Sequence, residues 1–200
     1  MSQADRPSLT LDLDGVIVRP PLGRNVAISR RLDLPPLPAT VRQVDPRPRW
    51  RYTYWLLRSG FEIARYSGRR PLPGVREALA ALAERRRLLV LSGRRWVVRP
   101  LVWRWLARNG LAAYVAEVHL NDAHLPSALF KLHTTQRLGV AEHVDDDGAT
   151  AYYLARHGLT VYLCDWPRNR GLPYPPSVRV VPDLGAVASL LDADADAAPR

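Results

Sequence analysis

The sequence lacks the residues from which several common kinds of site and membrane anchor are built. Its single cysteine, Cys164, cannot form an internal disulfide, and metal sites that need two to four cysteine ligands are excluded. The longest uninterrupted apolar runs, 78–83 and 111–116, fall far short of the roughly 20 residues that cross a bilayer. Residues 1–7 are polar and lack the basic, apolar and small-residue order of a signal peptide. We therefore expect a cytoplasmic protein with no membrane partner, whose chemistry rests on side chains other than thiols.

Lysine is almost absent, although the chain is strongly basic. Lys and Arg together number 29 against 19 Asp and Glu, a net charge of +10, yet the only lysine is Lys131. The positive charge favours an anionic partner, with phosphates as the first suspect. A general bias towards arginine explains the same charge, and we give this bias the greater weight. Because such a chain has kept one compact ammonium group, Lys131 is a candidate functional residue.

Length and patterning predict one domain that alternates strands and helices. The 200 residues are 47% hydrophobic and 24% charged, as in ordinary folded domains. No internal repeat of 20 to 50 residues is visible, which excludes solenoids and propellers. Apolar periodicity and turn residues predict strands at 8–14, 88–91, 115–120, 143–146, 160–164 and 178–181, and helices at 75–87, 100–109, 127–138 (capped by Ser127), 149–157 and 184–191.

This alternation predicts an α/β fold, a Rossmann-like parallel sheet with helices on both faces. Between the first strand and the first helix, residues 20–70 are rich in proline, arginine and aromatic residues. We interpret this stretch as a small cap inserted after the first strand. The core then comprises 1–19 and 71–191, and 192–200 form a flexible C-terminal tail.

Polar groups fall where the predicted strands end. In open α/β sheets, sites form at the carboxyl ends of the strands. Converging carboxylates would repel one another unless a cation neutralised them, and oxygen ligands favour Mg²⁺. A magnesium ion, a lysine and a hydroxyl together suit a phosphoryl group, whose phosphorus a carboxylate could attack. The groups are Asp12-Leu13-Asp14-Gly15, Ser92-Gly93-Arg94, Asp145-Asp146-Asp147-Gly148 and, at the entrance of a predicted helix, Lys131.

In this order, the motifs resemble those of the haloacid dehalogenase (HAD) superfamily of phosphohydrolases, over roughly residues 9–191. The Asp-x-Asp-Gly stretch that begins at Asp12 is similar to the family's first motif, and 89–94 to its second. Lys131 and 144–146 are similar to the third and fourth motifs. The resemblance implies an enzyme, a phosphatase that hydrolyses phosphoric monoesters.

By that resemblance, Asp12 would be the nucleophile that forms an aspartyl-phosphate. Asp14 would protonate the leaving alcohol and then activate water, a role that favours phosphate chemistry over dehalogenation. Ser92, Gly93 and Lys131 would bind the transferring phosphate, with Lys131 also shielding the charge of the nucleophile.

The resemblance also implies a Mg²⁺ cofactor. Asp12, the backbone carbonyl of Asp14 and one aspartate of the fourth motif would bind the ion. We favour Asp146 for that last ligand and keep Asp145 beside it, because the run of three aspartates allows a slip of one residue.

The substrate is less constrained than the chemistry. The interleaved arginines and aromatics of 47–54 could stack a base and hold an anion, or the aromatics could form the cap's own core. The stretch 165–169 resembles the end of 5'(3')-deoxyribonucleotidases, so we favour a nucleotide as the small phosphorylated substrate. The alternative is a nucleic-acid end phosphatase or a nucleic-acid-binding relative, although the arginines are scattered rather than clustered. A catalytically silent relative would be expected to have lost Asp12 or Asp14.

Several residues carry a plain structural expectation. The five histidines, His143 among them, have no metal-site spacing, and we expect them to be structural or exposed. Cys164 is most simply a small core residue. One of the three consecutive aspartates is expected to cap the helix that follows them.

Overall fold

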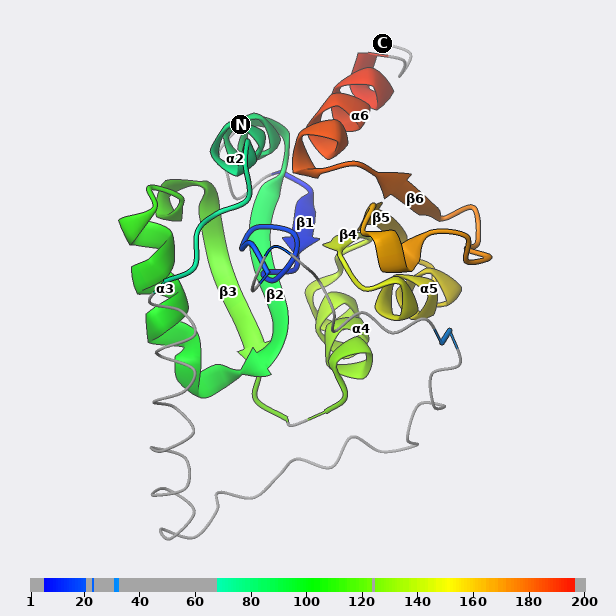
Figure 1. The fold of residues 1–200 in the computed structure, drawn as a ribbon, viewed down its shortest axis with the longest axis horizontal. Coiled ribbons are helices and arrows are strands. Elements are labelled where there is room, and N and C mark those ends of the chain that lie inside the picture. Colours follow the sequence, from blue (N-terminus) through cyan, green and yellow to red (C-terminus); the bar gives the residue numbers. More distant parts are fainter. Residues whose placement is uncertain (1–5, 21–22, 24–30, 33–67, 124, 197–200) are drawn as a thin grey trace, which may run out of the picture.

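A sheet of six strands forms the centre of the fold in the computed structural model, which describes residues 6–20, 23, 31–32, 68–123 and 125–196 (Figure 1). The strands lie in the order β3-β2-β1-β4-β5-β6, and every pair of neighbours is parallel. They are β1 (Ser8–Leu11), β2 (Arg87–Arg95), β3 (Val115–Asn121), β4 (Glu142–Asp145), β5 (Thr160–Cys164) and β6 (Val178–Val181). The helices are α2 (Val75–Arg85), α3 (Arg99–Arg108), α4 (Ser127–Leu138), α5 (Gly148–Arg156) and α6 (Leu184–Asp196), with short 3₁₀ turns η3 (Trp96–Val98), η4 (Ala112–Tyr114) and η5 (Pro167–Asn169).

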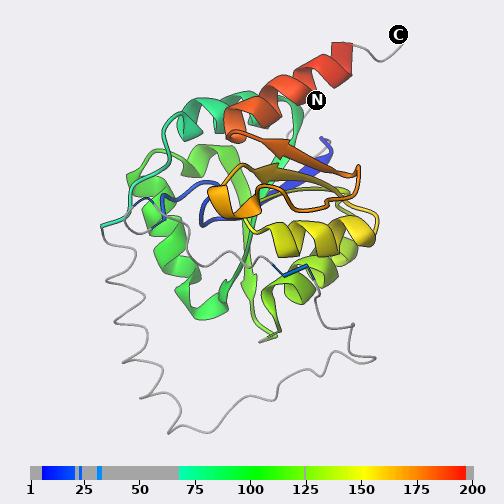
Figure 2. The same cartoon turned by 45° about the vertical axis from the view of Figure 1, so that its right-hand side comes forward.

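Helices cover both faces of the sheet. On one face α4 packs against α5, and on the other α2 packs against α6, with α3 beside β3 (Figures 1 and 2). Leu79, Leu106 and Val187 join α2, α3 and α6 in one buried cluster, while Leu132 and Leu154 join α4 and α5 in the other. This arrangement confirms the predicted parallel sheet with helices on both faces.

The central strand is buried on both sides, as expected for a parallel sheet between two helix layers. Leu9, Thr10 and Leu11 are all 0% exposed. β1 pairs with β2 on one side and with β4 on the other. From β1 the chain continues to β2 and β3 on one side, and then crosses to β4 on the other side of β1. The strand order therefore reverses at β1, and in such sheets ligand sites form at the carboxyl end of the strands where this reversal occurs.

The first strand is shorter than predicted. The expected strand at 8–14 ends at Leu11, because the chain then folds into a turn in which the N–H groups of Ile17 and Val18 both donate to the carbonyl of Leu13. Gly15 permits that turn with φ 74°. Asp12 still donates its N–H to the carbonyl of Val144 at 2.9 Å, so it continues the line of the strand.

The boundary between α2 and β2 also differs from the prediction. The helix expected to reach Arg87 ends at Arg85, because Arg86 is extended and Arg87 already pairs with Ser8 of β1. The strand expected to end at Leu91 continues to Arg95, paired with β3 through a register shift. The second motif is therefore strand rather than a turn after a strand.

Two helix ends were also predicted wrongly. Ser127 is the first residue of α4 and not its cap; Pro126 holds the capping position and makes no side-chain cap hydrogen bond. The helix expected to end at Leu191 runs on to Asp196, into the stretch assigned to a tail. Most of the predicted cap, 20–70, and the last residues, 197–200, lie outside the described residues. In the part of the chain that the structure describes, no helix has the length and apolar character of a membrane span.

Candidate active site

The polar residues singled out in the sequence meet at the carboxyl edge of the sheet, where β1, β2 and β4 end side by side. They line a pocket of about 260 Å³. All the predicted catalytic, phosphate-binding and metal-binding residues are among its walls, together with Arg94, Ser127, Asp147 and Thr150. The lining residues are Asp12, Asp14, Ser92, Gly93, Arg94, Ser127, Lys131, Asp145, Asp146, Asp147 and Thr150.

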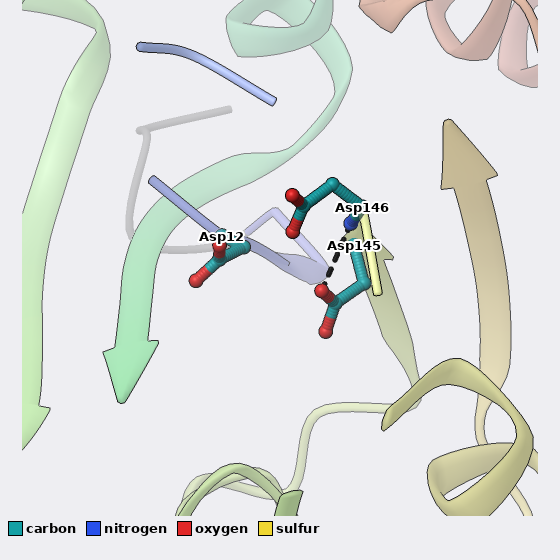
Figure 3. A group of neighbouring side chains, drawn as sticks. All are labelled: Asp12, Asp145 and Asp146. Carbon is teal, nitrogen blue, oxygen red and sulfur yellow. Dashed lines mark hydrogen bonds between the residues drawn. The ribbon is translucent and has the colours of Figure 1, made fainter. Parts of the chain in front are cut away.

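Three carboxylates converge in this pocket. One oxygen each from Asp12, Asp145 and Asp146 lies within 4.8 Å of the other two. Figure 3 shows the side chain of Asp12, just after β1, beside the two aspartates at the end of β4. Their exposed fractions are 5%, 0% and 7%. Because buried like charges repel strongly, this group needs positive charge close to it.

Lys131 supplies one positive charge from the second turn of α4. Its Nζ lies 2.8 Å from Asp145 Oδ2 and 3.1 Å from Asp12 Oδ1, and the side chain is only 4% exposed. Burial alone would lower the pKa of Lys131, but the charges of Asp12 and Asp145 outweigh burial and hold the pKa above its ordinary range. Lys131 is therefore an ammonium group that neutralises one of the three carboxylates.

Asp145 is fully occupied by hydrogen bonds. Its Oδ1 accepts the backbone N–H groups of Asp146 and Asp147 at 2.9 and 3.1 Å. Its Oδ2 accepts Lys131 Nζ at 2.8 Å and lies 2.9 Å from His143 Nε2. Burial would raise the pKa of Asp145, but Lys131 and His143 outweigh burial and hold it well below its usual range. A carboxylate offers about four lone-pair directions, so Asp145 has little left to offer a metal ion.

The remaining donors suit a hard divalent cation. Three carboxylates against one ammonium leave a net negative charge in a buried, oxygen-lined site, which is the environment that Mg²⁺ prefers. Since Asp145 is occupied, Asp12 and Asp146 are the side chains best placed to serve as ligands. The hydrogen bonds of Asp145, which the sequence does not reveal, make Asp146 the better candidate for the metal ligand that the run of aspartates left open.

The surroundings of Asp12 disfavour its negative charge. Burial raises the pKa of Asp12, the charges of Asp145 and Asp14 raise it further, and Lys131 offsets these effects only in part. A divalent cation among these oxygens would favour the ionised carboxylate, since opposite charge stabilises the charged form.

Asp14 is held by two arginines from different parts of the chain. Arg94 Nε donates to Asp14 Oδ2 at 2.6 Å, and Arg69 donates to Asp14 Oδ1. The side chains of Arg94 and Arg69 are 9% and 8% exposed. Burial would raise the pKa of Asp14, but the two guanidinium groups outweigh it and lower that pKa. Asp14 is therefore ionised in this arrangement.

The second motif places its residues by close packing. A Cβ atom on Gly93 would lie 2.4 Å from Ser127 Oγ and 2.8 Å from Ser127 Cβ, so a side chain there would collide with the start of α4. The absence of a side chain at Gly93 lets α4 approach the end of β2. That approach brings Lys131 to the same pocket as Ser92, which is 3% exposed.

Hydrogen bonds from α5 and from Asn169 hold the loop after β4 in place. Asp147 caps α5 by accepting the N–H of Ala149 at 3.2 Å and the hydroxyl of Thr150 at 2.9 Å, which confirms that one aspartate of the run is a helix cap. Asn169 donates to the carbonyls of Asp146 and Cys164 at 2.9 and 3.0 Å. Asn169 thereby ties the loop of Asp146 to the end of the neighbouring strand β5.

The stretch 165–169, which resembles a nucleotidase segment, has a structural part in this arrangement. Asn169 is buried and holds the loop just described, while Asp165 pairs with Arg170 at 2.9 Å on the surface. Neither Asp165 nor Asn169 lines the pocket of the carboxylates. The contacts of this stretch thus explain its place in the fold without identifying a nucleotide.

Comparison with known proteins bears on the fold. No protein-family model matches the chain, and no curated protein matches it in sequence. Among solved structures, the chain is similar to a haloacid dehalogenase-like hydrolase from Streptococcus pneumoniae, with 13% identity and a TM-score of 0.61 over 95% of this chain and 100% of that one. It is also similar to a predicted phosphoglycolate phosphatase from Haemophilus somnus, with 17% identity and a TM-score of 0.57 over 96% and 99% of the two chains.

A third structure of the same kind comes from Geobacter sulfurreducens. It is a HAD-superfamily hydrolase of subfamily IA, with 17% identity and a TM-score of 0.56 over 93% of this chain and 96% of that one. At such low identity the similarity shows the fold. The chain therefore has the α/β fold of haloacid dehalogenase-like proteins, as the order of its motifs predicts.

Proposed function

We propose that this protein is a Mg²⁺-dependent phosphomonoesterase that works through an aspartyl-phosphate on Asp12. One observation carries the proposal: Asp12 and Asp146 converge beside the buried ammonium of Lys131, at the carboxyl edge of a haloacid dehalogenase-like fold. Such a site is suited to bind a phosphate and a cation side by side, with a carboxylate available for attack.

The residues that would hold Mg²⁺ are Asp12, Asp146 and the backbone carbonyl of Asp14. When bound, the ion supplies positive charge that stabilises the phosphoryl oxygens and the ionised nucleophile. Ser92 and Lys131 bind the remaining phosphoryl oxygens, the hydroxyl as a hydrogen-bond donor and the ammonium as a point charge.

The reaction has two halves. In the first, a carboxylate oxygen of Asp12 bonds to phosphorus, the bond from phosphorus to the ester oxygen breaks, and Asp14 gives a proton to the departing alcohol. In the second, Asp14 takes a proton from water, whose oxygen attacks phosphorus and releases inorganic phosphate and the free Asp12.

The arginines beside Asp14 favour its ionised form, which suits the second half of the reaction. For the first half, Asp14 must hold a proton, so Arg69 and Arg94 must turn to another anion. For Arg94, which lines the same pocket, the substrate's own phosphate is such an anion.

A panel of phosphate esters tests the proposal. Purified protein should hydrolyse p-nitrophenyl phosphate or another simple monoester with Mg²⁺ and lose that activity when EDTA removes the metal. Asp14→Asn should reduce the rate strongly, since it removes the proton carrier while leaving the pocket in shape. An absence of hydrolysis across the whole panel, with Mg²⁺ present, would contradict the proposal.

For the substrate, we propose nucleoside monophosphates as the class to test first. The support is the resemblance of 165–169 to 5'(3')-deoxyribonucleotidases and the presence of aromatic residues within 20–70, a stretch that we propose forms a cap over the pocket.

Replacing Trp50 or Tyr52 with alanine should raise KM for a nucleotide through about 1 to 3 kcal/mol of lost stacking and leave the hydrolysis of p-nitrophenyl phosphate unaffected. Equal loss with both substrates would favour aromatics that form the core of the cap. A nucleic-acid end phosphatase would instead prefer an oligonucleotide bearing a terminal phosphate.

Asp146→Asn should weaken the response to metal. Loss of a charged ligand should raise the Mg²⁺ concentration for half-maximal activity by more than about tenfold, the lower limit for changes in the outer shell of a metal site. A Mg²⁺ titration of initial rates measures this shift. Asp145→Asn is the matched control, because it should lower the maximal rate without a comparable shift in the Mg²⁺ requirement. The reverse pattern would make Asp145 the ligand.

A further inference from the structure

His143 is buried in β4, behind the pocket and outside its walls. It is 0% exposed, and both ring nitrogens have partners: Nδ1 lies 2.9 Å from Thr10 Oγ1, and Nε2 lies 2.9 Å from Asp145 Oδ2. Thr10 also donates its hydroxyl proton to the carbonyl of Glu142 at 3.0 Å. A carboxylate only accepts hydrogen bonds, so Nε2 carries a hydrogen and donates to Asp145.

These contacts continue into the proposed active site without a break. From His143, Asp145 Oδ2 leads to Lys131 Nζ at 2.8 Å, and Lys131 Nζ leads to Asp12 Oδ1 at 3.1 Å. The residues in this series of contacts are each at most 5% exposed: Thr10, His143, Asp145, Lys131 and Asp12. Among the described residues, this series joins the core of the sheet to the candidate nucleophile through direct side-chain contacts.

A buried imidazole at this position needs a reason. β4 lies between the buried strands β1 and β5, and Val144, next to His143, is a buried apolar residue. A polar ring in such surroundings destabilises the fold unless its hydrogen bonds compensate. Those bonds go to Asp145, whose oxygen Oδ2 is shared between His143 and Lys131.

We propose that His143 is a positioning residue that sets the place of Lys131 through Asp145. By donating a hydrogen bond to Oδ2, the imidazole weakens the attraction of that oxygen for Lys131 and fixes the orientation of the Asp145 carboxylate. Lys131 then stands between Asp145 and Asp12 instead of being drawn wholly to Asp145. Without the donor at Nε2, the ammonium should move towards Asp145 and loosen its contact with Asp12.

Two variants separate this role from simple filling of space. In His143→Gln the side-chain amide nitrogen can reach the position of Nε2, so the donor to Asp145 is kept. In His143→Asn the shorter amide can serve the Thr10 side but cannot reach Asp145. His133→Asn, on the exposed side of α4, is the matched control for the substitution itself.

The first readout does not depend on enzyme activity. Because Lys131 is the only lysine of the chain, protein labelled with ¹⁵N and ¹³C in lysine gives one side-chain ammonium signal by NMR. We expect His143→Asn to shift or broaden that signal, and His143→Gln and His133→Asn to leave it close to its wild-type position. An unchanged signal in His143→Asn, or an equal change in the Asn and Gln variants, would overturn the proposal whether or not the protein is a phosphatase.

The second readout rests on the proposed function. With p-nitrophenyl phosphate and Mg²⁺, His143→Asn should lower kcat by about 10- to 100-fold, the range for outer-shell partners, while KM changes little. His143→Gln should recover most of that loss. A loss that follows the melting temperature equally in both variants would mean that the imidazole only supports the core.

Thr10→Val keeps the test decisive if His143→Asn does not fold. It removes the hydroxyl partner of Nδ1 without emptying the space around the ring, and should shift the Lys131 signal in the same direction by a smaller amount. A wild-type Lys131 signal in a folded Thr10→Val variant would contradict the proposal that His143 positions Lys131 through Asp145. An absence of phosphatase activity in the wild type would refute the function alone, since the NMR result stands apart from it.

Discussion

Asp12→Asn should abolish phosphate hydrolysis and leave the protein at least as stable as the wild type. The amide cannot form the phosphorylated intermediate, so kcat should fall by about 10⁴-fold or more, the scale seen when a catalytic nucleophile is removed. The stability expectation follows from the sign of the pKa shift. Burial raises the pKa of Asp12, so at neutral pH the ionised side chain is less favourable in the folded state than in the unfolded chain. A neutral side chain of the same shape removes that disadvantage.

Initial rates and thermal unfolding in metal-free buffer, measured on the same preparations, check both halves of this expectation. Turnover like that of the wild type would refute the proposed nucleophile. A marked fall in melting temperature would mean that Asp12 serves the fold as well as the chemistry. Wild-type protein incubated with the substrate should also yield an acid-stable but base-labile phosphoprotein, and Asp12→Asn should not.

Lys131→Met should damage both stability and activity. Removing the ammonium leaves Asp12 and Asp145 buried without their shared partner, and breaking a buried pair in this way costs about 3 to 5 kcal/mol. The pKa of Lys131 is raised in the fold, so its stabilising contribution is complete at neutral pH and is lost only as the pH rises through that raised value. Denaturant unfolding near pH 7 is therefore the measurement of choice.

Two companion variants sharpen the result for Lys131. Lys131→Arg keeps the charge but should lose most activity, because a planar guanidinium cannot take the place of a compact ammonium between two carboxylates. Adding Asp145→Asn to Lys131→Met should recover part of the lost stability, since it removes one of the uncompensated charges. Full activity in Lys131→Arg would make Lys131 an ordinary structural cation.

Much of the fold could be predicted because its signals are local. β5 and β6 have the predicted bounds, since each is a short stretch rich in β-branched and apolar residues between turn residues such as Gly158 and Pro182. The candidate site residues could be singled out for a similar reason, because all of them except Lys131 lie next to the end of a strand and the strand ends meet at one edge. Lys131, which lies on α4, stands out instead as the only lysine of the sequence.

The features that the sequence did not reveal depend on distant partners. β2 extends beyond Leu91 because Ser92 and Arg95 pair with β3, although the local residues favour a turn. The preference for Asp146 over Asp145 as the proposed metal ligand rests on the hydrogen bonds of Asp145 to His143 and Lys131, which no spacing discloses. The sequence predicts only a structural or exposed role for His143, because its contact with Asp145 is visible only in the fold.

The central place of β1 has a consequence for how the protein is made. Asp12, the proposed nucleophile, directly follows β1, the first strand in the sequence. One of the two neighbours of β1 is β4, however, and Thr10 meets His143 across 133 residues of chain. The fastening by Asn169 comes later still. Domains fold as their residues leave the ribosome, and pairings over such separations form slowly. In a nascent chain, Asp12 therefore emerges well before β4 and Asn169, and the surroundings that it has in the folded protein are incomplete until those segments follow.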